Sequence, residues 1–176
     1  MKKILYFATT LFVAMGLAAC DKEDAGGTAT ENVAGDWYVT IDAADENGEV
    51  VIEDPYHIGR THMFSYNTAA NIPTEMIIDD LSNFWEFKVL VNVNQQTNTF
   101  QTNTTENNNM VAGNEDINVT IEGGKILPKA GRQNNGSPAD SIVFYVSFSD
   151  DDSPAENGFK NYKVSGVRYS GLVEND

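Results

Sequence analysis

The segment FWEFKVLVNVN, residues 84–94, decides the fold class of this chain. Its large apolar side chains occupy every second position and so share one face: Trp85, Phe87, Val89, Val91 and Val93. Polar side chains take most of the other face. A period of two is typical of a β-strand with one buried side. The segment SIVFYVSFS, residues 141–149, alternates in the same way. We therefore expect an all-β protein.

Shorter segments of this kind follow one another from Gly35 to the end of the chain. The segment DWYVTID (36–42) alternates clearly, and Asn47-Gly48 after it predicts a hairpin turn. Gly123-Gly124 predicts a tight turn between two strands, residues 131–138 read as a polar loop, and no stretch of ten residues after Cys20 has a helical period. The further strands that we expect are 50–52, 60–68, 97–101, 107–111, 117–122, 125–127 and 162–169.

About eight to ten short strands joined by polar turns predict either a sandwich or a barrel. Consecutive hairpins favour an antiparallel meander barrel, because closure removes the exposed edges of the sheet. We expect this barrel to span residues 34–176.

Composition excludes several classes of function. The 176 residues include 11 Lys and Arg against 26 Asp and Glu, which gives a net charge of −15. This charge repels phosphate, so we expect no nucleic-acid partner. The single cysteine, Cys20, allows neither an intrachain disulfide nor a cysteine-rich metal site. The length suits one domain, and hydrophobic residues at 41% suffice for a core.

The N-terminus has the features of a secretion signal. Lys2 and Lys3 precede an apolar stretch, residues 4–17, that is shorter than the roughly 20 residues of a membrane span. The stretch ends in Leu-Ala-Ala-Cys20, which resembles the lipobox of bacterial lipoproteins, whose cysteine is lipidated. We expect a signal peptide over 1–19 and a lipidated Cys20 with a flexible acidic tether over 20–33. The alternative is a structural cysteine that follows an ordinary signal peptide.

The first residues of the tether indicate where the protein is exported. Residues 21–24, Asp-Lys-Glu-Asp, resemble the export signal of Bacteroidetes-type lipoproteins bound for the outer face of the outer membrane. A solvated acidic linker is the alternative reading. The chain lacks a basic patch for anionic lipid head groups, so the acyl chains of Cys20 would be its attachment to the membrane. We expect a lipid-anchored outer-membrane protein exposed at the cell surface.

Two positions resemble a known barrel superfamily. Gly35-Asp36-Trp37 looks like the G-x-W motif of lipocalins and other calycins, in which the Trp closes one end of the barrel beneath an Arg from the last strand. Arg168 is placed to be that partner through a cation–π contact. Two features depart from lipocalins. The chain has no second motif of the T-D-Y type, and only six residues follow Ser170, too few for a C-terminal helix.

A closer resemblance covers most of the chain. It is carried by the segments GDWYVT (35–40), FSYNTAANIPTEMIIDDLSNFWEFKVLVNV (64–93), ADSIVFYVSFSDD (139–151) and KVSGVRYSG (163–171). Together they resemble the Bacteroidetes lipoprotein family called "lipid-binding putative hydrolase". The resemblance implies a calycin-like barrel, a lipid anchor and an exported location. It supplies no catalytic residues to carry over.

Residues for hydrolytic chemistry are few. The chain has no G-x-S-x-G nucleophile motif and no H-E-x-x-H zinc motif. Its two histidines, His57 and His62, would lie on opposite faces if one strand held both. The candidate companions of His62 are Ser65, Asp79 and Asp80.

The carboxylate clusters are Asp79-Asp80 and Asp150-Asp151-Asp152. A glycosidase would need two such acids about 5–10 Å apart, which sequence cannot establish. Residues 150–158 fail the spacing of a calcium-binding EF-hand. We assign no catalytic residue, no metal and no cofactor.

The remaining candidate site is the interior of the barrel, which in a barrel of about eight strands either is filled by side chains or holds one small ligand. Its expected apolar lining is Trp37, Phe64, Tyr66, Trp85, Phe87, Phe144, Val146, Phe148 and Tyr162. The same residues could fill the barrel completely, and the sequence leaves both alternatives open.

Three functions follow from these features. The first is a lipoprotein whose barrel binds a lipid or another apolar small molecule. The second is a hydrolase, for which His62 and Ser65 are the material. The third is a non-catalytic interaction subunit at the cell surface, with protein partners that the sequence does not identify.

Overall fold

The computed structural model describes residues 27–103 and 107–175, which form nine strands and two short helical turns. The strands are β1 Gly35–Ala44, β2 Val50–Ile52, β3 Thr61–Asn67, β4 Glu75–Asp79, β5 Lys88–Asn94, β6 Thr99–Gln101, β7 Val119–Arg132, β8 Pro138–Phe148 and β9 Asn161–Arg168. The helix α2 covers Ser153–Asn157, and a 3-10 turn covers Val173–Asn175.

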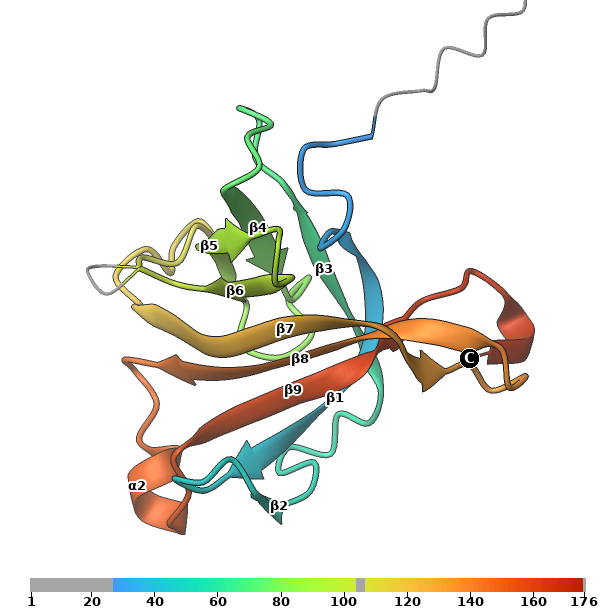
Figure 1. Ribbon diagram of the computed structural model, residues 1–176. Helices are drawn as coiled ribbons and strands as arrows, with labels where there is room; N and C mark the ends of the chain where they lie inside the picture. Colours follow the sequence, from blue (N-terminus) through green and yellow to red (C-terminus); the bar gives the residue numbers. More distant parts are fainter. Residues whose placement is uncertain (1–26, 104–106, 176) are drawn as a thin grey trace, which may run out of the picture.

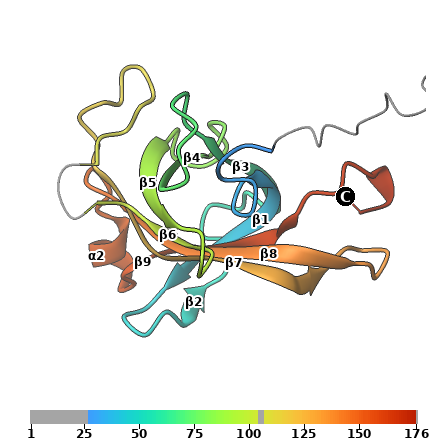
Figure 2. The same cartoon turned by 45° about the horizontal axis from the view of Figure 1, so that its top comes forward.

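The strands form a closed antiparallel barrel (Figure 1). From β3 to β9 each strand pairs with the next along the chain, and β1 pairs with both β3 and β9, which closes the ring (Figure 2). The short β2 pairs only with the end of β1 and lies outside the ring. The predicted all-β meander barrel is therefore confirmed.

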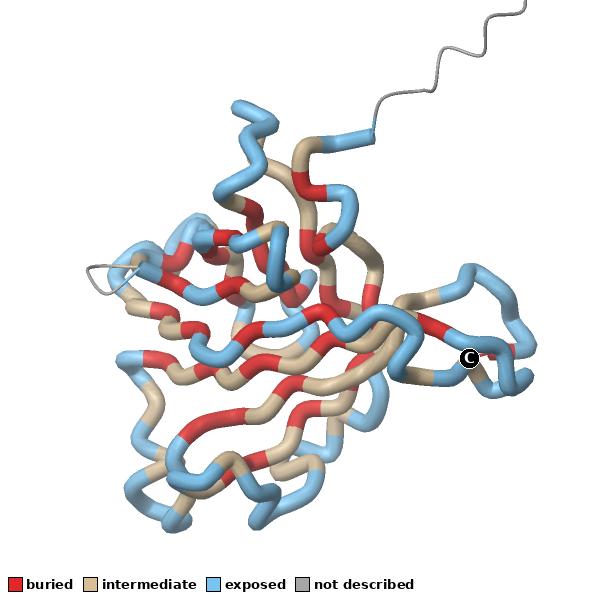
Figure 3. Tube along the Cα trace, in the orientation of Figure 1, coloured by how far each residue is buried: buried red, intermediate tan, exposed pale blue. Residues whose placement is uncertain are grey.

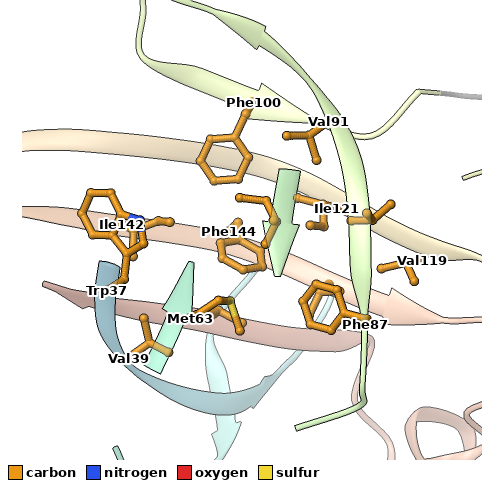
Figure 4. Packing of buried hydrophobic residues seen from close by; sticks show 14 of the residues in the cluster. Trp37, Val39, Met63, Phe87, Val91, Phe100, Val119, Ile121, Ile142 and Phe144 are labelled. Atoms are coloured by element: carbon orange, nitrogen blue, oxygen red, sulfur yellow. The ribbon is translucent and has the colours of Figure 1, made fainter. Parts of the chain in front are cut away.

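Alternation along each strand builds one continuous core. In β1 Trp37, Val39 and Ile41 are buried, as their spacing predicts, and so are Ala43 and Ala44 at its end. Most strands show the same alternation of buried and partly exposed positions (Figure 3). Side chains from opposite walls meet inside the barrel, with Phe144 and Met63 among them (Figure 4). Large side chains thus occupy the interior.

Two predicted strand boundaries are wrong. Residues 84–87 precede β5 as a loop, because Glu86 has a positive φ of 51° that breaks the extended chain. Gly123-Gly124 makes no turn: β7 continues through it as an irregularity between Glu122 and Lys125, while β8 pairs with both halves.

Two further assignments change. Residues 107–111 form no strand and make one isolated bridge at Asn108. The strand β4 lies in a segment for which the sequence predicted none, because Met76, Ile77 and Ile78 are all buried and therefore do not alternate.

The pairing of β1 with β9 defines two ends of the barrel. Trp37 lies opposite Arg168, whereas Ala43 lies opposite Tyr162, six residues and about 20 Å further along the strand. The closed end comprises the Trp37–Arg168 pair with residues 27–34, 68–74, 95–98, 133–137 and 169–175. The aromatic end comprises Tyr162 with loops 53–60, 80–87, 107–118 and 149–160.

The predicted signal peptide and Cys20 lie outside the described residues. Within residues 27–103 and 107–175, no helix has both the length and the apolar character needed to cross a membrane.

Candidate functional site

The closed end is sealed by hydrogen bonds and one stacked arginine. The buried Trp37 donates its indole N–H to Ser65 Oγ at 2.8 Å, and Ser65 donates to the Val33 carbonyl at 2.7 Å. The Arg168 guanidinium carbon lies 4.5 Å from the centre of the Trp37 ring. Arg168 also donates to the Ala34 carbonyl at 2.6 Å. The residues expected to close the barrel thus meet here, and the segment before β1 covers them.

The opposite end holds a cluster of aromatic rings. Tyr56 comes from loop 53–60, Phe84 and Trp85 from loop 80–87, and Tyr162 from the start of β9. The centres of these four rings lie 5.0 to 6.2 Å apart in every pair. Phe148 stacks on Trp85, at 5.0 Å between centroids and 10° between planes. We call these five residues the aromatic cluster.

Two adjacent carboxylates fix the polar atoms of this cluster. Asp150 Oδ1 accepts the indole N–H of Trp85 at 3.1 Å, and Asp151 Oδ2 accepts the hydroxyl of Tyr162 at 2.7 Å. The hydroxyl of Tyr56 lies 2.8 Å from that of Tyr162. Burial, together with hydrogen bonds to Tyr56 and Asp151, raises the pKa of Tyr162 far above its usual value. The Tyr162 hydroxyl therefore stays protonated and donates to Asp151.

Loop 80–87 is organised by a single buried side chain. The carboxylate of Asp80, 1% exposed, accepts the backbone N–H groups of residues 82, 84, 85 and 87 at 2.8 to 3.2 Å. Burial raises the pKa of Asp80 even though these N–H groups stabilise its charge. Leu81, Ser82 and Glu86 adopt positive φ. Asp80 thus holds a strained loop whose tip presents Phe84 and Trp85 to the mouth of the barrel.

The members of the aromatic cluster range from exposed to fully buried side chains. Tyr56 is 42% exposed, Phe84 and Trp85 are half-buried, and Phe148 and Tyr162 belong to the core. The neighbouring strand β2 exposes all three of its apolar side chains. Aromatic contacts therefore connect the surface at Tyr56 with the buried core at Tyr162, and apolar side chains of this kind suit an apolar ligand.

The expected lining residues are not all in the interior. Trp37, Phe87, Phe144, Val146, Phe148 and Tyr162 belong to the buried core, and Trp85 packs against it from the mouth. Phe64 and Tyr66 differ from the expectation. In β3 the buried residues are Met63 and Ser65, so the alternation turns Phe64 and Tyr66 to the outer face. The physical reason is the hydrogen bond to Trp37, which requires Ser65 to point inward.

On the outer face Tyr66 joins an ion pair. Its hydroxyl donates to Asp79 Oδ2 at 2.8 Å, and Lys88 Nζ lies 2.9 Å from the same oxygen. Partial burial of Asp79 opposes ionisation, but the Leu81 backbone N–H, Lys88 and Tyr66 outweigh it and lower the pKa of this carboxyl. Asp79 is thus a structural acid of the barrel wall.

The predicted companions for hydrolysis do not meet. His62 Nδ1 lies 2.9 Å from Asp36 Oδ1, with the His62 ring stacked on Tyr38 at 5.2 Å. Ser65 faces the opposite side of β3, where Trp37 and Val33 occupy its hydroxyl. His57 is exposed in loop 53–60. His62 and Ser65 therefore form no nucleophile–base pair.

The carboxylates of the two acidic clusters also form contacts that stabilise the fold. Asp79 and Asp80 hold the wall and loop 80–87, and Asp150 and Asp151 hold the aromatic cluster. Among the described residues, no three His, Cys, Asp or Glu side chains come together as a set of metal ligands.

Two hollows on the surface lie away from the aromatic cluster. One of about 470 Å³ crosses β5, β6 and β7 over Gly123-Gly124 and is rich in amides, with Asn92, Asn94 and Gln101 in its lining. Another, of about 650 Å³, lies at the closed end, where Glu31, Gln95, Asp140 and Arg168 line it. The second lining is mainly polar, and the first combines amides with Val93 and Phe100. Neither connects with the buried core through aromatic rings as the aromatic cluster does, so we place the candidate site there.

Sequence reasoning missed Tyr56, Phe84 and the two acids that bind the rings. Tyr56 follows Asp54-Pro55 in a loop with no periodic pattern, and Phe84 takes the polar face of the predicted strand. Asp150 and Asp151 had the appearance of solvated turn residues. Only the contacts across loops far apart in the sequence reveal their roles.

Comparison with known proteins gives one family. No curated protein matches the sequence. The family described as "lipid-binding putative hydrolase" matches residues 22–173, nearly the whole described chain. This chain, a closed β-barrel with an aromatic cluster at one end, belongs to the lipid-binding putative hydrolase family.

Proposed function

We propose that this protein is an outer-membrane lipoprotein whose barrel binds a lipid or another apolar small molecule at the aromatic end. The observation that carries the proposal is the aromatic cluster, which connects exposed Tyr56 with the buried core through half-buried Phe84 and Trp85. The family match supports the same class of ligand.

The ligand enters by displacing aromatic side chains. Because the barrel interior is occupied by core residues, an alkyl chain gains contact area at the mouth, where Phe84 and Trp85 cover Tyr162 and Phe148. Each buried CH₂ group contributes about 0.8 kcal/mol to such binding. The Trp85 indole is held by one side-chain hydrogen bond, to Asp150 at 3.1 Å, and water can solvate this exposed acceptor when the hydrogen bond breaks.

The position of the N-terminal segment supports an orientation at the membrane. Ala29 is held at the closed end by Asn71, at 2.8 Å, and by Gln95, at 2.8 Å. Cys20 precedes Gly27 by seven residues, a span of at most about 25 Å in an extended chain. An acylated Cys20 would therefore keep the closed end near the bilayer and turn the aromatic end away from it.

Native mass spectrometry tests the proposal. A protein that begins at Asp21 contains every described residue and hence the whole barrel, and it should be purified from extract of its own host. We expect an additional mass of a few hundred daltons that disappears on denaturation, and its loss in the Trp85→Ala variant. A clean apo mass that stays unchanged after incubation with a mixture of lipids would contradict the proposal.

A further inference from the structure

The aromatic end is strongly acidic. Its four loops contain two basic residues, Arg60 and Lys160, against ten carboxylates: Glu53, Asp54, Asp80, Glu86, Glu115, Asp116, Asp150, Asp151, Asp152 and Glu156. All of these acids except Asp80 are exposed or half-buried, and carboxylates carry a negative charge at neutral pH. A ligand that approaches the aromatic cluster meets a negative field.

The two basic residues of these loops do not neutralise the ten acids. Arg60 lies over the Tyr38 ring at 4.0 Å on the barrel wall, and Lys160 is paired with Glu46 at 3.7 Å. The ion pairs of the described residues involve Asp36, Asp79, Asp140 and Glu46, none of them among the ten loop acids.

The rings themselves favour a positive charge. A cation over the face of an indole or phenol ring is attracted by the ring quadrupole, most strongly by Trp. Tyr56 is exposed and Trp85 is half-buried, with ring centres 5.9 Å apart, and Asp150 accepts the Trp85 indole N–H at 3.1 Å. Aromatic faces and solvated carboxylates together form the chemistry that recognises an ammonium group.

We infer that the ligand of the aromatic end is an amphiphile with a cationic amine or quaternary ammonium head, and that fatty acids and other anionic amphiphiles are disfavoured there. This inference rests on the proposed function, because it specifies the head group of the same ligand. The apolar chain would pack on Phe84 and Phe148, and the head would lie between Tyr56, Trp85 and the loop acids.

The closed end shows that this charge is local. With the adjoining ends of β7 and β8 included, its segments contain three acids, Glu31, Asp140 and Glu174, against three bases, Lys129, Arg132 and Arg168. A protein acidic only by overall composition would not concentrate its carboxylates around one mouth.

Tryptophan fluorescence distinguishes the head groups. The protein from Asp21 onward is titrated with decyltrimethylammonium, decanoate and decyl maltoside, each below its micelle concentration, and Trp85→Phe identifies the signal that comes from the mouth. We expect the ammonium probe to bind about tenfold more tightly than decanoate at low ionic strength. At about 1 M salt, where the Debye length is about 3 Å, this preference should fall severalfold.

Matched variants assign the preference to the loops. Glu86→Gln with Glu156→Gln should reduce the ratio of ammonium to decanoate affinity about two- to threefold. Glu31→Gln with Glu174→Gln, at the closed end, should leave that ratio unchanged. If decanoate binds as tightly as the ammonium probe, the inference is overturned while the proposed function stands. If none of the three probes changes the Trp85 signal, the proposed function itself fails.

Discussion

Each end of the barrel is built around one tryptophan that donates its indole N–H to a side-chain oxygen. At the closed end the acceptor is the buried hydroxyl of Ser65, and Arg168 covers the ring of Trp37. At the aromatic end the acceptor is the exposed carboxylate of Asp150, and the ring of Trp85 is half-buried. Because water cannot reach the buried Ser65 hydroxyl, Trp37 is a fixed part of the core. Because water can solvate the Asp150 carboxylate, Trp85 is free to exchange its contacts for those of a ligand.

Loss of each tryptophan should separate stability from binding most clearly. Trp37→Ala removes a fully buried side chain and leaves the Ser65 hydroxyl without its donor, so we expect a loss of about 3–5 kcal/mol in the free energy of unfolding. Trp85→Ala should cost about 1 kcal/mol, because its ring already contacts solvent. Urea unfolding, followed by circular dichroism, measures both.

The two variants should rank in the opposite order for ligand binding. At a temperature where both are folded, Trp85→Ala should abolish most of the binding, whereas Trp37→Ala should retain it. Equal losses of stability would show that the aromatic end is as much a part of the core as the closed end.

The sequence predicts the closed end better than the aromatic end. Trp37 and Arg168 lie in strands that pair directly, so the strand period and the G-x-W motif suffice to place them together. Tyr56, Phe84 and Asp150 lie in three loops that are distant in sequence, and no pattern sets their distances. The inward orientation of Phe144 and Phe148 was predictable, since both lie in a strand with one buried face, β8.

The prediction of which residues face the interior failed where apolar residues occupy both faces of a strand. In β3, Phe64 and Tyr66 are larger than Ser65, so hydrophobicity alone favours the wrong face. The hydrogen bond between Trp37 and Ser65 instead decides which face of β3 is buried. A polar residue that faces the core through a specific partner cannot be recognised from the strand that contains it.

Asp80→Ala should affect the aromatic end more than any other loop change. The substitution removes the acceptor of four backbone N–H groups, and a buried donor left without a partner costs about 1–3 kcal/mol. We expect a loss of about 2 kcal/mol in the free energy of unfolding and faster amide hydrogen exchange in loop 80–87.

Exchange at the closed end provides the control for this variant. Amides of residues 35–39, which pair with β3, should keep their protection relative to the global stability. Uniform acceleration over both ends would contradict the view that Asp80 organises one loop.

Two arginines that stack on aromatic rings allow a matched test of the closed end. Arg168→Met removes the contact with Trp37, the hydrogen bond to the Ala34 carbonyl and the ion pair with Asp140 at 3.3 Å, so we expect a loss of about 1–2 kcal/mol. Arg60→Met removes a contact of similar geometry, 4.0 Å over Tyr38, but at an exposed position, and should cost about 0.5 kcal/mol or less. Thermal unfolding of both variants measures the difference, and a larger effect at Arg60 would contradict it.

The smallest effect is the pH dependence that Asp79 gives to the wall beside the aromatic end. Its pKa is lowered in the folded protein, because the Leu81 N–H, Lys88 and Tyr66 outweigh its partial burial. Between the folded and unfolded pKa values the unfolded chain therefore binds more protons, and stability falls as the pH falls. The contribution of Asp79 is fully present above about pH 4 and is lost as the pH drops through its folded pKa.

Asp79→Asn isolates this contribution from that of its neighbour. Asp80, whose pKa is raised by burial, acts in the opposite direction, since the folded state holds its proton to higher pH. The variant should lose about 0.5–1 kcal/mol at pH 7, because Lys88 is partly exposed and regains water. On acidification below about pH 4 the gap to the wild type should close. A gap that stays constant from pH 7 to acid would mean that replacing the carboxyl by an amide acts through packing in the wall, and that the charge of Asp79 contributes nothing to the difference between the two ends.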